Sequence, residues 1–496
     1  MGIHESAKLV GEVPLNEKII NGVKWTALFA ILGHFVSLVK TPILVRLLIP
    51  ADFGLMGMLL TVMAFTSPIT EMGIGSAIIQ KQDISKIQLS TLYWLNILVG
   101  IVMFIFVISI SPLIADFYDE QRLVDLLHLF AFMFLIIPLG SQFEKLMEKE
   151  LNFGLPVQAK TAALFANFSI SVTLALFGCG VYSLIYGRLG GSFISSFIFT
   201  TWGMKHHKPS LLFSIKESKS LLVFGAYQIS ERFIKILSTN IDKLFIGKFF
   251  GAEVLGYYTV AHALVIIPMM TLNPIITKVT FPVFSIIQKD IGKINEYFTL
   301  AIKVLLTLNF PIYGGLIMTS SIFVPIIFGE GWEPVVPVLQ VLSLGALIWT
   351  ISNPVGSVLL AKGRADVSFM LNLLRAVVLI GMLALAYWIG RSILSIAIGI
   401  VVSRYVTDPF IHLYMNKYFG IKYIKIIKHL IKIASFTILM SLSVYSVDYL
   451  NLNDANYELI LKVCLGFLTY SALVALFDKE SRGILKIFLS KRGFVI

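Results

Sequence analysis

Charged side chains interrupt the long apolar stretches of this sequence, where a charge is costly unless it faces a polar cavity or an opposite charge. Most of these charges are basic. Arginine can offer a phosphate two parallel hydrogen bonds, whereas lysine acts on it as a point charge. The excess of cations therefore indicates that something negatively charged passes through the protein. The residues that we expect to bind it in a basic cavity are Lys40, Arg188, Arg232, Lys235, Asp242, Lys303 and Arg375.

One apolar stretch carries a stripe of polar residues. Arg232, Lys235, Thr239 and Asp242 follow one another at intervals of three or four positions, which places them on one face of a helix. We expect this face to look into the cavity. In an alternative interpretation, Lys235 pairs with Glu231, four positions before it, near the inner surface of the membrane.

Other charged residues also admit a structural interpretation. Arg188 lies in the motif GRLGGS, whose glycines permit close contact between helices, so the arginine either pairs with backbone carbonyls or binds the anion. Arg404 and Asp408 are four positions apart, and we expect them to form a local pair. Glu71 begins EMGIGS, where a helix breaks, and it either caps the break or holds a coupling ion.

Helices that move need places to bend, and a proline inside a helix removes one backbone hydrogen bond. We expect gating bends at Pro42 and Pro311. The sequence has no Walker motif and no His, Cys and carboxylate cluster at metal-ligand spacing, and its two cysteines, Cys179 and Cys464, fit packing. We therefore expect no enzyme activity, no metal and no cofactor, apart from coupling to H⁺ or Na⁺.

The composition of the chain indicates which kind of structural element carries these residues. Of the 496 residues 57% are hydrophobic and 14% are charged, against about 25% charged residues in a soluble protein. The apolar runs are long enough for spanning helices of about 20 residues and far longer than the strands of a membrane barrel. The sequence therefore predicts an all-α integral membrane protein. We expect about 14 transmembrane helices, near residues 20–46, 53–79, 89–115, 122–147, 155–178, 180–202, 218–247, 254–284, 294–327, 334–360, 366–388, 391–414, 425–447 and 456–477.

Loop charges predict the orientation. Lysines and arginines gather in alternate loops and at both ends of the chain, whereas the intervening loops are mostly acidic. Basic loops stay in the cytoplasm, so we expect both termini there and the protein in a bacterial cytoplasmic membrane. The net charge of +12 follows from this asymmetry and does not indicate nucleic acid. No loop is long enough to fold as a catalytic domain.

A weak internal repeat divides the chain. IPADFGLMGMLLTV at residues 49–62 resembles GAEVLGYYTVAHAL at 251–264, about two hundred positions later. An even number of spans in each half gives both halves the same orientation, as in transporters built from parallel repeats. We expect an N-terminal lobe over residues 1–210, a C-terminal lobe over 211–414, and two further helices with a basic cytoplasmic tail over 415–496.

The two regions that carry this repeat also carry a family resemblance. LVRLLIPADFGLMGMLLTVMAF, EMGIGSAIIQKQDISKIQLSTLYWLNILVG and NIDKLFIGKFFGAEVLGYYTVA resemble the openings of the two halves of Wzx-type polysaccharide flippases. These belong to the multidrug/oligosaccharidyl-lipid/polysaccharide flippase superfamily. The resemblance implies two pseudo-symmetric six-helix lobes in a V shape, plus two C-terminal helices.

The resemblance also implies a function: translocation of polyprenyl-diphosphate-linked oligosaccharide repeat units by alternating access, for surface polysaccharide such as lipopolysaccharide or exopolysaccharide. Expected partners are this lipid-linked substrate, membrane lipids, and the polysaccharide polymerase and chain-length machinery. The alternatives are a cation-coupled multidrug extruder, a peptidoglycan-precursor flippase and a scaffold subunit without transport. The basic stripe argues against an extruder of organic cations, and the cost of intramembrane charges argues against a scaffold.

Overall fold

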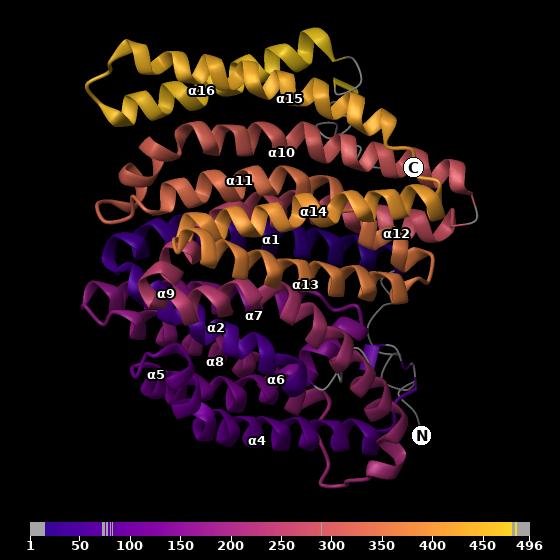
Figure 1. Cartoon of the computed structure of the whole chain (residues 1–496). Helices are drawn as coiled ribbons and strands as arrows, with labels where there is room; N and C mark the ends of the chain where they lie inside the picture. Colours follow the sequence, from indigo (N-terminus) through magenta and orange to yellow (C-terminus); the bar gives the residue numbers. More distant parts are fainter. Residues whose placement is uncertain are drawn as a thin grey trace. The chain divides into compact units, whose positions relative to one another are not determined.

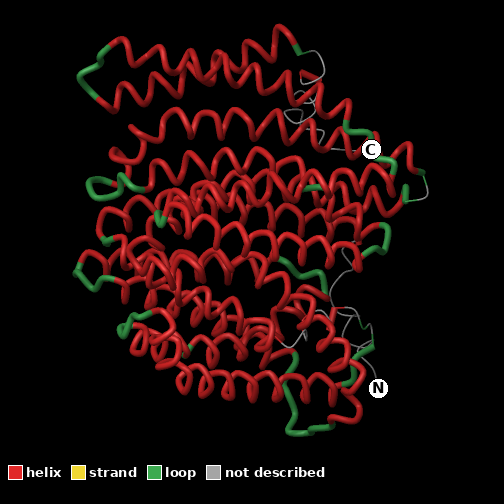
Figure 2. The backbone as a smooth tube through the Cα atoms, in the orientation of Figure 1, coloured by secondary structure: helices red, strands yellow, loops and turns green. Residues whose placement is uncertain are grey.

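The computed structural model describes residues 15–71, 75, 78–79, 81, 83–288, 290–478 and 482–483, and this part of the chain is helical with short loops and no strand (Figure 2). The all-α class is confirmed. The helices are α1 (Leu15–Leu47), α2 (Pro50–Glu71), α4 (Lys86–Tyr118), α5 (Leu123–Ala131), α6 (Met133–Lys149), α7 (Gly154–Leu176), α8 (Val181–His206), α9 (Ile215–Ile286), α10 (Ile291–Phe328), α11 (Val335–Ser352), α12 (Val355–Ala361), α13 (Ala365–Gly390), α14 (Ile393–Phe419), α15 (Ile424–Tyr445) and α16 (Ala455–Phe477).

The predicted apolar segments coincide with helices to within a few residues wherever the structure describes them. Segment 122–147 is divided into α5 and α6, and segment 334–360 into α11 and α12. Segments 218–247 and 254–284 both lie in α9, which is interrupted at Gly251 by φ 79° and ψ −176°. A positive φ is accessible to glycine because it has no Cβ. α1 continues through Pro42, and α10 continues through Pro311.

Eleven helices of the described residues are long and apolar enough to cross a membrane. This number supports a multi-pass membrane protein, since backbone groups in lipid must find their hydrogen-bond partners within the protein. The count of fourteen spans and the arrangement of the lobes stay predictions.

The chain folds as two compact units. Unit 1 contains residues 1–48 and 59–233, and unit 2 contains residues 49–58 and 234–496. Two helices therefore contribute to both units: α2 passes from one to the other between Met58 and Leu59, and α9 between Phe233 and Ile234. The domain boundaries expected from the repeat, at residues 210 and 414, stay predictions.

The core of unit 1 forms where α4, α6 and α8 meet. Tyr93 of α4 and Phe143 of α6 are almost completely buried, with ring centroids 5.2 Å apart. The loop after α8 is tied to α4, because Trp94 Nε1 donates to the carbonyl of Ser210 over 2.9 Å and the amide of Ser210 donates to Ser90 Oγ. These contacts hold the connection between α8 and α9 against the unit.

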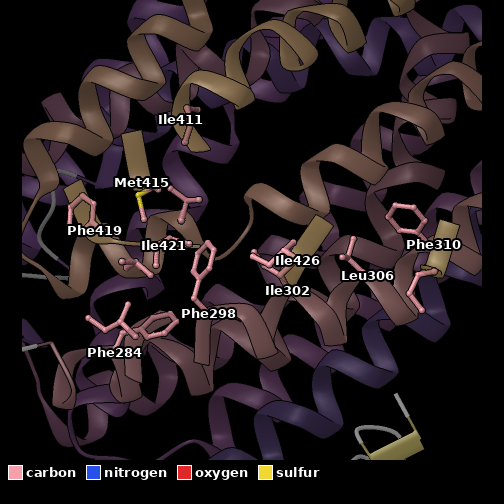
Figure 3. Packing of buried hydrophobic residues seen from close by; sticks show 14 of the residues in the cluster. Phe284, Phe298, Ile302, Leu306, Phe310, Ile411, Met415, Phe419, Ile421 and Ile426 are labelled. Carbon is pink, nitrogen blue, oxygen red and sulfur yellow. The ribbon is translucent and has the colours of Figure 1, made fainter. Parts of the chain in front are cut away.

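The core of unit 2 is a continuous apolar cluster (Figure 3). Phe298 and Phe310 of α10 pack there with Ile411 and Phe419 of α14 and with Ile426 of α15. α15 and α16 run side by side next to α10 (Figure 1). In lipid, helices associate through close van der Waals packing and not through removal of apolar surface from water, so this cluster fixes the scaffold on which the charged residues of α13 and α14 stand.

Candidate functional site

The first cluster of predicted residues lies in unit 1, around Lys40. Lys40 Nζ of α1 donates a hydrogen bond to Asn167 Oδ1 of α7. Ser171 Oγ, one turn further along α7, donates to the same oxygen over 3.2 Å. The amide of Asn167 therefore fixes the direction of the Lys40 side chain without neutralising its charge.

Arg188 of α8 joins this cluster. It lies within electrostatic reach of Lys40 and is exposed. α8 is pressed against α7 here, since a Cβ added at Gly187 would lie 1.9 Å from Ser171 Oγ, and one at Gly191 would lie 2.7 Å from the carbonyl oxygen of Ala163. The glycines of GRLGGS thus permit close helix contact, as the sequence predicts.

Within the described residues, the three helices that carry the cluster bring no acid close to it. Neither α7 nor α8 contains Asp or Glu, and the acid of α1, Glu17, stands at the far end of that helix from Lys40. Among the residues that the structure describes, Arg188 forms no ion pair. Two cations held close together in this way favour an anion between or beside them.

Arg232 has a different environment. Its guanidinium pairs with the carboxylate of Glu71 at the end of α2, and the two side chains are 53% and 50% exposed. Phe233 lies edge-on to Phe65 next to this pair, with ring centroids 5.9 Å apart. The charge of Arg232 is therefore compensated by Glu71, for which the sequence predicts either a helix cap or a site for a coupling ion. The side chains of Lys235 and Glu231, and so the alternative pair between them, lie outside the described residues.

The second cluster lies in unit 2, around Asp242 of α9. Asp242 is buried and accepts a hydrogen bond from the hydroxyl of Tyr258. Its other oxygen, Oδ1, has no hydrogen-bond partner within the part of the chain that the structure describes. Arg404 of α14 interacts electrostatically with Asp242 and lies over the ring of Trp349, with 5.9 Å between the guanidinium carbon and the ring centroid.

Arg375 of α13 lies in the same region, where it forms an ion pair with Asp408 of α14. Arg375 Nη2 lies 2.9 Å from Asp408 Oδ1, and Asp408 is completely buried. Ser352 Oγ donates to Asp408 Oδ2 over 2.7 Å, so both carboxylate oxygens have partners. The local pair of Arg404 and Asp408 expected from sequence is an electrostatic contact only, because the hydrogen-bonded ion pair of Asp408 is formed with Arg375.

A signal for the Arg375–Asp408 pair is present in the sequence. The turn between the antiparallel helices α13 and α14 lies at Arg391 and Ser392, and the two residues of the pair stand equally far before and after it. Residues at equal distances from a tight turn lie opposite each other, so the hairpin register could have identified the pair. Lys303, the remaining predicted cation, lies partly buried on α10.

Comparison with known proteins gives both a family and a fold. A family model described as "Polysaccharide biosynthesis protein" matches residues 43–337. The lipopolysaccharide biosynthesis protein WzxC of Escherichia coli (strain K12) is 37% identical over 361 residues, which cover 73% of this chain and 73% of WzxC. The teichuronic acid biosynthesis protein TuaB of Bacillus subtilis (strain 168) is 33% identical over 355 residues, 72% of this chain and 74% of TuaB.

Solved structures show the same fold at low sequence identity. The lipid II flippase MurJ in an inward closed conformation superposes with a TM-score of 0.77 over 94% of this chain and 100% of MurJ, at 16% identity. An inward-facing multidrug resistance transporter of the MATE family, in the MOP superfamily, gives a TM-score of 0.64 over 79% of this chain and 98% of the transporter, at 15% identity.

Proposed function

Because the chain belongs to the polysaccharide biosynthesis protein family, as its resemblance to Wzx-type flippases indicates, we propose that it flips polyprenyl-diphosphate-linked oligosaccharide repeat units across the cytoplasmic membrane. The repeat units then serve the synthesis of a surface polysaccharide. Relatives named for lipopolysaccharide and teichuronic acid biosynthesis support this substrate class. The flippase fold supports translocation as the activity.

The observation that carries the proposal is the cation pair of Lys40 and Arg188, close to which the described residues of α1, α7 and α8 bring no carboxylate. A diphosphate brings at least two negative charges, and removing a charged group from water costs several kcal/mol unless an opposite charge receives it. Lys40 is already oriented by Asn167, and Arg188 can donate two hydrogen bonds to one phosphate. The pair therefore suits a diphosphate head group, while the polyprenyl chain stays in lipid.

The same charges distinguish the proposal from the multidrug extruder. An organic cation would be repelled by Lys40 and Arg188, since α7 and α8 supply no carboxylate to receive it. A peptidoglycan-precursor flippase would share the diphosphate chemistry, and the family match favours polysaccharide units instead.

The remaining parts of the proposal concern coupling and orientation. In this proposal the protein works by alternating access, and the transport cycle is coupled to a H⁺ or Na⁺ gradient. We assign the coupling to Asp242, because its burial and its Oδ1, which has no hydrogen-bond partner among the described residues, suit a group that gains and loses a cation. Both termini face the cytoplasm in this scheme. The exported unit passes to the polysaccharide polymerase and chain-length machinery.

A deletion strain tests the function. We expect loss of surface polysaccharide, with diphosphate-linked repeat units trapped in the inner leaflet. Supplying the wild-type chain should restore the surface polysaccharide and clear the trapped repeat units. Normal polymer together with new sensitivity to cationic drugs would replace the proposal with the extruder. Accumulation of peptidoglycan precursor with cell lysis would replace it with the precursor flippase.

A further inference from the structure

A chain of hydrogen bonds runs through unit 2 from Asp408 to the loop before α15. Asp408 and His412 are four positions apart on α14, so they lie on one face of that helix. Ser352 Oγ, at the end of α11, lies 2.7 Å from Asp408 Oδ2 and 3.3 Å from His412 Nε2. His412 Nδ1 lies 3.0 Å from the hydroxyl of Tyr423, the residue that precedes α15. The chain therefore joins a carboxylate, two hydroxyls and an imidazole.

The chemistry of these groups fixes the direction of each hydrogen bond. An ionised carboxylate only accepts, so the Ser352 hydroxyl donates its one proton to Asp408. Ser352 Oγ must then accept from His412, which places the ring proton on Nε2. A neutral imidazole accepts at its other nitrogen, so Tyr423 donates to Nδ1. Every proton in the chain therefore points toward Asp408.

The chain passes along the apolar cluster of unit 2. Ile411 and Met415 of α14 are completely buried in this cluster. The ring of Tyr423 packs against the cluster and lies edge-on to Phe298, with 6.1 Å between the centroids. Tyr423 is partly exposed, and Lys422 next to it is exposed and belongs to the basic loops, which the proposed function places in the cytoplasm. A proton can therefore enter the chain from cytoplasmic water at Tyr423.

At the other end of the chain the guanidinium of Arg375 is only partly used. Its Nη2 lies 2.9 Å from Asp408 Oδ1, whereas its Nε is buried and has no hydrogen-bond partner among the described residues. The side chain of Arg375 is 21% exposed. Because an arginine can give an anion two parallel hydrogen bonds, Arg375 has a donor available for a second anion. The negative charge of Asp408 opposes the approach of that anion.

The other charges near this end balance one another. Arg404, one turn before Asp408 on α14, lies over the ring of Trp349 and interacts electrostatically with Arg375, Asp408 and Asp242. α11, which packs against α14 and is described over its whole length, contains no Asp, Glu, Lys, Arg or His. The two arginines therefore face two carboxylates, and a proton on Asp408 leaves one cation in excess.

We propose that this chain delivers a cytoplasmic proton to Asp408 and thereby makes Arg375 a ligand for an anionic group of the lipid-linked substrate. The inference rests on the proposed function, and it is separate from the gradient coupling assigned to Asp242. Neutral Asp408 no longer compensates Arg375, whose guanidinium then attracts a phosphate or a sugar carboxylate.

The transfer conserves protons. Ser352 gives its proton to Asp408 Oδ2 and takes the Nε2 proton of His412. His412 takes the hydroxyl proton of Tyr423 at Nδ1, so its ring stays neutral and changes tautomer. Tyr423 takes a proton from water. Chains of this kind, with histidine between oxygen groups, carry protons in membrane transporters.

Proton uptake on binding tests the switch at Asp408. The purified full-length protein is titrated with undecaprenyl diphosphate, and calorimetry in buffers with different heats of ionisation gives the protons taken up. We expect wild type to take up about one proton more than Asp408→Asn, and its binding to weaken about tenfold for each unit by which the pH rises. Asp408→Asn is already neutral, so its binding should not weaken in this way. Equal proton uptake by the two proteins would overturn the proposal.

A double variant tests Arg375 as the ligand. Asp408→Asn with Arg375→Gln should bind undecaprenyl diphosphate more weakly than Asp408→Asn alone, and equal affinity would overturn the role of Arg375. If Asp408→Asn does not fold, the double variant takes its place in the proton measurement, since it leaves neither charge without a partner. Uptake of the extra proton by the double variant would then overturn the proposal.

The rate of proton uptake tests the chain itself. Ser352→Ala and Tyr423→Phe each remove one hydroxyl and leave the ion pair of Arg375 with Asp408 in place. We expect each to slow proton uptake after mixing with undecaprenyl diphosphate by about a hundredfold, with unchanged affinity. Tyr418→Phe, at an exposed position of α14 outside the chain, is the control and should match wild type. Wild-type rates in both hydroxyl variants would overturn the path.

Failure of the proposed function would look different. If neither wild type nor Asp408→Asn binds undecaprenyl diphosphate at any pH, although both are folded, the substrate class is wrong and the proposed function fails. If both bind it and take up the same number of protons, the proposed function stands and only the switch at Asp408 fails.

Discussion

Arg232 of α9 donates a hydrogen bond to Glu71 of α2, across 161 positions of the sequence. α2 thus contacts α9 near both of its ends: Glu71 forms this ion pair at one end, and near the other end a Cβ added at Gly54 would lie 1.6 Å from the carbonyl oxygen of Ala252. The contact changes the interpretation of Arg232, because its removal deprives Glu71 of a partner as well as removing a cation. A loss of export in Arg232→Ala would therefore not by itself identify a substrate ligand.

Exchanging the two charged residues distinguishes a role of Arg232 in the ion pair with Glu71 from a role in binding the substrate. We expect Arg232→Ala and Glu71→Ala each to impair export with normal abundance of the protein in the membrane, because each leaves one charge without its partner. The double variant Glu71→Arg with Arg232→Glu should recover export, measured as surface polymer in the deletion strain. If the double variant stays inactive while the ion pair re-forms, Arg232 acts directly on the substrate.

Lys40 and Arg188 should tolerate only conservative replacement. A hydrogen bond to a charged group contributes about 1.5–3 kcal/mol, so Lys40→Ala or Arg188→Ala should slow export roughly ten- to a hundredfold. Lys40→Arg should retain most of the export activity. The control is Lys160→Ala, since Lys160 of α7 pairs with Glu144 at 2.6 Å and takes no part in the cluster. Equal export by Lys40→Ala and Lys160→Ala would contradict the assignment.

Asn167 offers a test of charge against hydrogen bonding. Asn167→Asp keeps an oxygen that accepts from Lys40 but adds a negative charge to α7, a helix that has no Asp or Glu of its own. We expect a greater loss of export than in Asn167→Ser, because the carboxylate neutralises the field that attracts the diphosphate. The comparison is made on outer-leaflet repeat units at matched protein abundance. The opposite order would show that orientation of Lys40 matters more than its free charge.

Asp242 should be needed for coupling. Asp242→Asn removes the charge while preserving the shape of the side chain, and we expect vesicles that contain this variant to lose the response of flipping to an imposed pH or Na⁺ gradient. Asp119→Asn, at an exposed helix end outside the apolar segments, serves as the control. An unchanged response in Asp242→Asn would move the coupling site elsewhere.

The Arg375–Asp408 pair should contribute to stability. Removing one partner of a buried ion pair costs about 3–5 kcal/mol, because the other charge stays buried without compensation. We expect Asp408→Ala to lower the Tm of the purified protein clearly, and Arg375→Met with Asp408→Leu to recover much of the loss. A Tm that is equally low in both variants would show that Asp408 is held mainly through Ser352.

The helices and their positions were largely predictable from the sequence. Apolar runs such as 89–115 and 366–388 coincide with α4 and α13, because a run of this length and composition is stable in lipid only if every backbone group is bonded within it. The points at which one apolar run divides into two helices were less predictable. α5 and α6 separate at Phe132 within one apolar run, and hydropathy does not distinguish one helix from two.

The sequence by itself determined the class of protein, the places of the helices, the internal repeat and the family, because these depend on local composition and on residue order. Only the tertiary structure decided which charges are compensated. Arg232 is paired with Glu71 and Arg375 with Asp408, while Lys40 receives a neutral amide and keeps its charge. The physical reason is that each of these contacts joins different helices. The energy of a buried charge depends on the partner brought to it by packing, and not on its neighbours in the sequence.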